Sequence, residues 1–222
     1  MKSEMLSILL LGSSFLALFY SGEFLLKFFH LPNELTRKWV HVGTGILTML
    51  FPIYLHSHWS VLALCASFAV LLFLSIKYGW FPAIHKIERK SHGSLLYPLA
   101  VYSCFLLLEK LNLAYVFYAL PLLTMAISDP IAAMVGTRFP FGRFKTFRGF
   151  KSLSGCLAFF LSSFILALLF LPNSLELSRF LTVALIVGFT ATLAEAMSGL
   201  GIDNLSIPVA VWLSLYFLLP VL

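Results

Sequence analysis

The chain has 222 residues and a formal net charge of +6, and 60% of its residues are hydrophobic whereas 11% are charged. With a mean hydropathy of +0.98, it carries more apolar side chains than a water-soluble core of this size could hide. These values exclude an ordinary soluble domain and predict an all-α, polytopic integral membrane protein. No soluble domain or long linker interrupts the apolar segments, so residues 1–222 are expected to form a single membrane domain.

The apolar segments predict about eight transmembrane helices, each near the ~20 residues that a helix needs to cross the hydrocarbon. The expected spans are Met5 to Phe28, Trp39 to Leu55, Trp59 to Ile76, Leu95 to Leu108, Ala114 to Val135, Leu153 to Leu171, Phe180 to Ser198 and Leu205 to Leu222. The three cysteines lie in or beside these segments without metal-ligand spacing, so we interpret them as packing residues.

The basic residues predict the orientation, since short cytoplasmic loops are enriched in Lys and Arg. All but three of the 15 Lys and Arg residues lie at one set of alternate helix ends, and the exceptions are Lys2, Lys110 and Arg179. This bias places both termini outside, and the segments near 29–38, 77–94, 137–152 and 199–204 in the cytoplasm. The same assignment brings three acidic residues, Asp129, Glu195 and Asp203, to the cytoplasmic side.

An aspartate stands at the end of the fifth apolar segment, within Ser128-Asp129-Pro130. An ionisable group at membrane depth is costly, which favours a functional role for Asp129. The alternative is that Asp129 only caps the helix that Pro130 begins. Because proline disfavours helical conformation at the residue before it, we predict a break at Ser128-Asp129, with freed backbone groups lining a polar site.

The loop that follows this segment is basic and contains no acidic residue. It carries Arg138, Arg143, Lys145, Arg148 and Lys151, with Gly136, Gly142 and Gly149 and the hydroxyls of Ser152 and Ser154. Cations, hydroxyls and glycines that let backbone amides approach a ligand predict a polyphosphate-binding loop. The run from Gly149 to Ser152 is not a Walker A motif, since Phe150 separates the glycine from the lysine and no strand is expected before it.

A basic cluster precedes the second apolar segment. Arg37 and His41 are four residues apart, so on a helix they share a face with Gly45, and Lys38 lies beside them. A basic pair at a helix end is often only a membrane anchor, and a lone histidine is often a satisfied polar residue. Both interpretations stay open for this cluster.

Acidic residues recur near the C-terminus. Glu195 lies within an apolar run, and the turn that starts at Gly199 carries Asp203 and Asn204. Together with Asp129, these carboxylates supply the hard oxygen ligands that Mg²⁺ prefers, and Mg²⁺ carries the nucleotide in most phosphoryl transfers. The pattern therefore predicts a magnesium site formed by Asp129, Glu195 and Asp203.

These residues, in this order, resemble the polyprenol kinase family, which includes phytol kinase, dolichol kinase and the CTP-dependent diacylglycerol kinase. The resemblance rests on Arg37-Lys38-x-x-His41, Asp129-x-x-Ala132-x-x-x-Gly136, Lys151-Ser152-x-Ser154-Gly155, Glu195, and Asp203-Asn204 ahead of Pro208. In that family a nucleoside triphosphate, typically CTP, phosphorylates a membrane lipid alcohol. The chain departs from the family pattern at Ser128, Pro130 and Ser154, which obscures the subfamily.

We therefore expect a lipid-alcohol kinase with Mg²⁺ as cofactor, CTP as phosphoryl donor and a membrane isoprenoid alcohol or diacylglycerol as acceptor, without a nucleic-acid partner. Asp129, Lys151 and Asp203 are the expected catalytic residues, and either Asp203 or His41 would take the proton from the lipid hydroxyl. The expected nucleotide-binding residues are Arg37, Lys38, Gly136, Arg138, Lys145, Lys151, Ser152, Ser154, Gly155 and Asn204.

Two alternatives remain. Phosphatidate cytidylyltransferase has a similar central motif, but the C-terminal segment from Glu195 to Asn204 lacks the Lys-Arg, Lys-Asp and His-Gly-Gly rich ending expected of that family. A transporter of an anionic solute also fits a broken helix with charges at membrane depth. No extended internal repeat supports the transporter, so the kinase is the leading interpretation.

Overall fold

A computed structural model describes residues 2–85, 93–146 and 149–219. Part of the predicted cytoplasmic segment 77–94, residues 86–92, lies outside the described residues, as does Arg148 of the basic loop. The elements in chain order are α1 (Lys2–Phe28), α2 (Asn33–Thr48), α3 (Phe51–Tyr54), α4 (His58–Tyr78), α5 (Pro82–His85), α6 (Gly93–Lys110), α7 (Val116–Leu123), the π-helical η1 (Thr124–Ser128), α8 (Asp129–Arg138), β1 (Arg143–Thr146), β2 (Gly149–Ser152), α9 (Leu153–Phe170), α10 (Leu177–Met197) and α11 (Asp203–Leu218).

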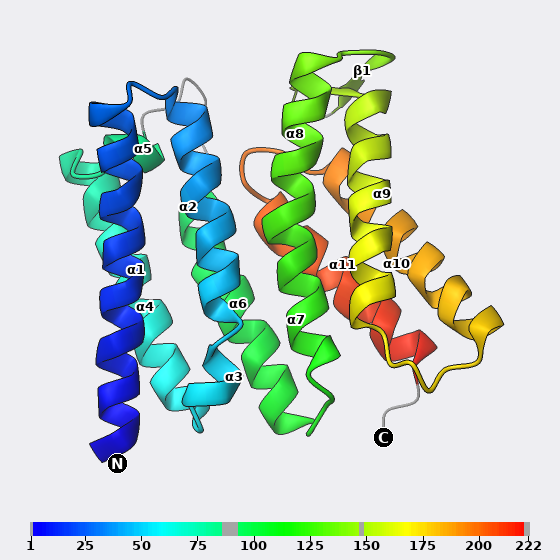
Figure 1. The fold of residues 1–222 in the computed structure, drawn as a ribbon, viewed down its shortest axis with the longest axis horizontal. Helices are drawn as coiled ribbons and strands as arrows, with labels where there is room; N and C mark the ends of the chain where they lie inside the picture. The colour runs from blue at the N-terminus through cyan, green and yellow to red at the C-terminus, as the bar shows by residue number, and fades with distance from the viewer. Residues whose placement is uncertain (1, 86–92, 147–148, 220–222) are drawn as a thin grey trace.

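The long helices form a bundle in which successive helices alternate in direction (Figure 1). Within the described part of the chain, five helical segments are long and apolar enough to cross a membrane: Glu4–Phe28, His58–Tyr78, Val116–Arg138, Leu153–Phe170 and Leu177–Met197. The helical, membrane-spanning architecture is confirmed. The number of eight spans is not. Helices α2 and α11 have 16 residues each, the predicted second span is divided between α2 and the one-turn α3, and α6, which holds the predicted fourth span, is not among the five. The outside location of both termini stays a prediction.

The segment from Val116 to Arg138 is the central column of the bundle. In an apolar stretch of 18 residues within this segment, 78% of the residues are buried inside the protein. The corresponding share in the other four candidate spans is only 22–33%. Helix α7 packs against α11, and α8 packs against α9. Asp129, the first residue of α8, therefore lies on a helix that is surrounded by protein for most of its length.

The predicted helix break at Ser128-Asp129 is wrong. Ser128 (φ −72°, ψ −35°) and Asp129 (φ −63°, ψ −49°) both have helical dihedrals, and the chain widens into the π-helical η1 just before them. Pro130 has no amide hydrogen, and in a regular α-helix its ring would press on the carbonyl of Ala126. The wider π-helical turn relieves that contact without ending the helix.

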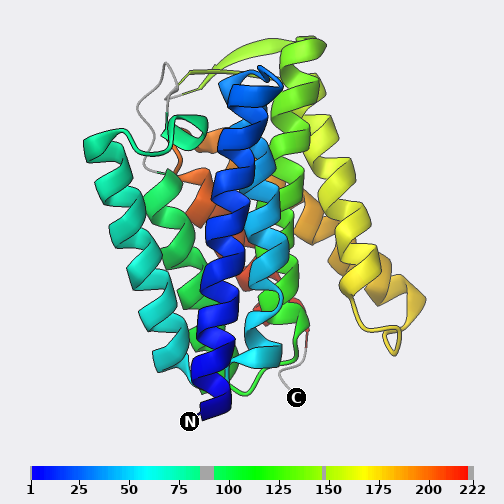
Figure 2. The ribbon, with the colours of Figure 1, turned by 60° about the vertical axis from the view of Figure 1, so that its left-hand side comes forward.

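The basic loop between α8 and α9 contains a two-stranded antiparallel hairpin that the sequence did not predict. Phe144 pairs with Lys151, and Lys145 pairs with Phe150. The hairpin lies at the end of the bundle opposite the first turn of α1 (Figure 2). Lys151 thus does lie on a strand, but the strands form an isolated hairpin and not the strand–loop–helix unit of a P-loop, so the rejection of a Walker A motif holds.

Candidate functional site

A cavity of about 1300 Å³ joins the hairpin end of the bundle to the space between α1, α2, α4 and α6. It exceeds the ~300–1,000 Å³ typical of pockets for one drug-sized ligand. Most of the predicted site residues line it, namely Arg37, His41, Asp129, Gly136, Lys151, Ser152, Gly155, Glu195, Asp203 and Asn204. The fold therefore brings the sequence motifs together at one cavity.

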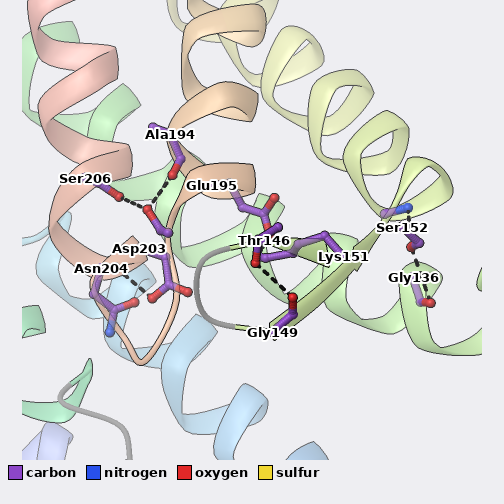
Figure 3. A network of polar contacts seen from close by, with 12 residues as sticks. Gly136, Thr146, Gly149, Lys151, Ser152, Ala194, Glu195, Asp203, Asn204 and Ser206 are labelled. Carbon is purple, nitrogen blue, oxygen red and sulfur yellow. Dashed lines mark hydrogen bonds and ion pairs between the residues drawn. The ribbon is translucent and has the colours of Figure 1, made fainter. Parts of the chain in front are cut away.

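An ion pair between β2 and α10 closes part of this cavity. Lys151 Nζ donates a hydrogen bond to Glu195 Oε1, and the two side chains point toward one another in Figure 3. Glu195 is 4% exposed, and its Oε2 atom is buried without a hydrogen-bond partner among the described residues. A buried carboxylate oxygen without a partner is unfavourable. This oxygen atom is suited to bind a cation or a hydrogen-bond donor.

Asp129 and Asp203 share one charged environment with this ion pair. The Asp129 carboxylate interacts electrostatically with Glu195, Lys151 and Arg37. Asp203, the first residue of α11, interacts in the same way with Asp129, Lys151 and His41. Each aspartate thus has another carboxylate and the cation Lys151 in its surroundings, a mixture of charges that suits a site for a cation and a polyanion.

The three predicted metal ligands do not form a complete metal cluster. In residues 2–85, 93–146 and 149–219, no three His, Cys, Asp or Glu side chains lie close enough together to hold one metal ion. Mg²⁺ is usually bound by one or two carboxylates plus water and substrate phosphates, and seldom by an all-protein cage. The carboxylates and the partnerless Oε2 atom of Glu195 therefore fit a Mg²⁺ ion that arrives with the nucleotide.

The basic residues of α2 are held by a glutamate that sequence reasoning missed. Arg37 donates from Nε and Nη2 to Glu34 at 3.2 and 2.8 Å, and Lys38 Nζ lies 3.7 Å from Glu34 Oε1. Glu34 and Arg37 line the cavity, whereas Lys38 does not. The spacing of three and four residues from Glu34 was the available signal, but the sequence prediction placed only Arg37, Lys38 and His41 on the helix that enters the second span.

His41 is fixed by contacts on two sides. Its Nε2 lies 3.3 Å from the carbonyl oxygen of Met125 in η1, and Tyr97 Oη donates to the His41 carbonyl at 3.2 Å. A carbonyl can only accept, so Nε2 carries the hydrogen and Nδ1 of the neutral ring is the proton acceptor. Tyr97 was not predicted, because a tyrosine within an apolar segment gives no distinctive signal.

The predicted alignment of Arg37, His41 and Gly45 on one face of α2 has a structural reason. A Cβ atom built at Gly45 would lie 2.2 Å from Ala126 Cβ and 2.9 Å from Tyr97 Oη. Only glycine allows α2 to approach η1 so closely. This contact holds the polar face of α2 beside the turn that leads to Asp129.

The serine and glycine residues after the hairpin form a helix junction. Ser152 Oγ accepts from the Gly155 amide at 3.2 Å and donates to the Gly136 carbonyl at 3.4 Å, while Ser154 donates to the Phe139 carbonyl. A Cβ at Gly136 would lie 3.4 Å from Gly155 Cα, so α8 and α9 cross closely here. Packing explains Gly136 and Gly155, since Gly136 lies inside α8 and the Gly155 amide is bonded to Ser152. The expected approach of a ligand to the amides of Gly142 and Gly149 stays a prediction. Contact of Ser152 and Ser154 with phosphate stays a prediction.

Other predicted nucleotide ligands lie away from the cavity. Arg138, Lys145 and Ser154 are not among its lining residues, whereas Arg143, which was not assigned to the site, is. Lys145 and Lys151 occupy positions of the hairpin that point to opposite faces. Asn204 does line the cavity, but its side-chain amide donates to the Gly93 carbonyl at 2.9 Å and so supports the start of α6.

The sequence is 33% identical to phytol kinase of Synechocystis sp. over 182 residues, which cover 80% of this chain and 76% of that protein. No protein-family model matches the chain. No solved structure matches it. The similarity covers most of the chain, and the motifs quoted in the sequence analysis meet at the cavity described above. The chain therefore belongs to the polyprenol kinase family and is a membrane-embedded kinase that transfers phosphate to an alcohol.

Proposed function

We propose that the protein is a CTP-dependent kinase that transfers the γ-phosphoryl group to the hydroxyl of a membrane isoprenoid alcohol, such as phytol or a polyprenol, or of diacylglycerol. The observation that carries this proposal is the arrangement of the cavity. Asp129, Asp203 and the Lys151–Glu195 pair lie at a polar end that continues between apolar helix faces. Such a cavity suits a reaction between a water-soluble polyanion and a lipid. The similarity to phytol kinase supports the same acceptor class.

The cations that line the cavity would bind the nucleotide phosphates. Lys151, Arg37 and Arg143 all contribute to the lining, and charge-assisted hydrogen bonds from such side chains to phosphate are strong. Lys151 is paired with Glu195 and Arg37 with Glu34 before any phosphate arrives. Phosphate binding would therefore exchange a carboxylate partner for a phosphate oxygen at both positions.

Asp129 and Asp203 would hold Mg²⁺, with Glu195 Oε2 as a further ligand or as a partner of a bound water. A Mg²⁺ ion held there would supply positive charge to the phosphates of the nucleotide. The lipid hydroxyl would lie between the phosphate end and the apolar part of the cavity. Asp203, or His41 through Nδ1, would accept its proton.

We infer that the polar end of the cavity faces the cytoplasm. The hairpin and the first turn of α2 lie at the same end of the bundle (Figure 1). Both belong to the set of helix ends that carries most of the Lys and Arg residues, and such ends usually face the cytoplasm. In a variant without native cysteines, a thiol at Lys145→Cys should react with a membrane-impermeant reagent only after permeabilisation. A thiol at Asn173→Cys should react in intact cells, and the reverse pattern would contradict this orientation.

Transfer from labelled nucleotide tests the proposed function directly. With γ-³²P CTP, purified protein and a lipid alcohol in detergent, label should enter a lipid monophosphate and the soluble product should be CDP. A cytidylyltransferase would leave the label in pyrophosphate, require phosphatidate and place cytidine in the lipid. A parallel series with γ-³²P ATP tests the donor, and the absence of transfer from either nucleotide would overturn the kinase proposal.

A further inference from the structure

The cavity does not end at the charged residues. Beyond His41 it continues along α1, α3 and α4, where its wall is apolar and largely aromatic. The lining side chains there include Phe15, Phe19, Phe51, Leu64, Phe68 and Leu72. The polar end and this apolar channel form one continuous cavity, so a molecule with a hydroxyl head and a hydrocarbon tail fits it in one orientation.

The spacing of the lining residues gives the length of the channel. On α4 the cavity is lined at Leu64, Phe68, Leu72 and Ile76, which recur every four residues and so lie on one helix face. At 1.5 Å per residue this face is about 18 Å long. That is more than half of the ~30 Å hydrocarbon core of a bilayer. The channel is therefore long enough for an extended hydrocarbon chain of similar length.

Aromatic rings line the deep end of the channel. Phe51 is 2% exposed, its ring centroid lies 5.8 Å from that of Phe15, and the Phe15 ring lies 5.1 Å from that of Phe68. Thr48 is the polar lining residue nearest Phe51 in the chain, and its hydroxyl donates to the Gly45 carbonyl at 2.8 Å. This end thus presents apolar rings and a hydroxyl that is already satisfied.

We propose that this channel holds the single hydrocarbon chain of the acceptor alcohol, and that the wall formed by Phe51, Phe15 and Phe68 limits the chain length that is phosphorylated. The inference rests on the proposed function, since it takes the channel's occupant to be the kinase acceptor. Each methylene buried in an apolar site contributes about fourfold to binding. Longer chains therefore gain affinity until the tail reaches the aromatic wall, and beyond that length the hydroxyl is displaced from the charged end.

Opposite substitutions at Phe51 test the inference. The measurement is kcat/KM for a series of isoprenoid alcohols that lengthens by one isoprene unit per member. Wild-type protein should show a maximum at one length. Phe51→Ala should move the maximum to a longer alcohol and raise kcat/KM for that alcohol by about tenfold. Phe51→Trp should move the maximum to a shorter one.

Phe117→Ala is the matched control. Phe117 is also buried, at 3% exposure, but it contacts Trp212 and does not line the cavity. The overall activity of this variant is not compared with that of the wild type. Only its chain-length profile is compared, and this profile should equal that of the wild type. A second measurement uses wild-type protein and an isoprenoid alcohol with a photoreactive group at its tail. Crosslinks should fall on Phe15, Phe51 or Phe68.

The outcomes separate the two proposals. Phosphorylation of isoprenoid alcohols by the wild type, with a length profile that neither Phe51 variant shifts, would overturn the channel inference and leave the proposed function intact. Crosslinks on exposed outer side chains such as Leu161 or Leu169 would overturn it as well. If the wild type phosphorylates diacylglycerol but no isoprenoid alcohol, the channel inference fails and the proposed function stands, and if it phosphorylates neither, both proposals fail.

Discussion

Substitution of Asp129 by asparagine is expected to lower kcat/KM about a hundredfold or more while the protein stays folded in the membrane. Asparagine keeps the size of the side chain and its position at the start of α8. It removes the negative charge that interacts with Lys151 and Arg37 and that would hold Mg²⁺. Loss of such a charged contact in a phosphoryl-transfer site costs roughly 3 kcal/mol of transition-state stabilisation. Steady-state transfer by purified protein, with a thermal unfolding curve, measures the effect.

Glu176→Gln serves as the control for this substitution. Glu176 is an exposed acid before α10, outside the cavity, so its neutralisation should leave transfer within about twofold of wild type. If Asp129→Asn also turned over at close to the wild-type rate, the assignment of Asp129 to the metal and nucleotide site would be wrong.

Removal of the Lys151 side chain is expected to have the second large effect. Lys151→Ala should lower kcat/KM about a hundredfold, because it takes away a cation positioned for the transferred phosphate. Lys145→Ala should stay within about twofold of wild type, because Lys145 belongs to the same hairpin but does not line the cavity. The two variants change the net charge equally, so a difference between their kcat/KM values reports the position of the lysine and not the loss of charge.

Lys151→Ala also leaves Glu195 buried without its counter-ion, which is itself destabilising. The double variant Lys151→Ala/Glu195→Gln separates the two effects when it is compared with Glu195→Gln alone. It should regain thermal stability relative to Lys151→Ala, while its transfer should stay well below that of Glu195→Gln. Recovery of transfer together with stability would show that Lys151 only neutralises Glu195, and equal losses in Lys145→Ala and Lys151→Ala would show that the loop acts by charge alone.

The helices were the predictable part of this fold. A membrane requires apolar segments of nearly fixed length, so every expected span has a helical counterpart even where its ends moved. The largest shift of a helix start is in α2, which begins at Asn33, six residues before the predicted span. This earlier start places Glu34 and Arg37 on the same helical turn. Hydropathy finds the apolar part of a helix and misses a polar first turn, which is where Glu34 lies.

The hairpin was not predictable from local pattern. Its strands are only four residues long and mix basic, aromatic and glycine residues, so no clear alternation marks them. The sequence predicted nucleotide contact for both Lys145 and Lys151, and only the strand pairing shows that they point to opposite faces of the hairpin. Pairs that join distant segments, such as Lys151 with Glu195, depend on tertiary packing and leave no signal in the spacing of a single chain.

The π-helical η1 has a consequence for how the acid is positioned. Each residue turns an α-helix by about 100°, and a π-helical turn holds one residue more than an α-helical turn between hydrogen-bonded groups. The direction in which Asp129 points around the helix axis, relative to α7, therefore depends on the number of residues from Thr124 to Ser128, and not only on their identity. A chain shorter by one residue there would keep every polar side chain and still aim Asp129 about 100° away from its partners. The number of residues in η1 thus helps to determine the site, and no substitution of a site residue would reveal this.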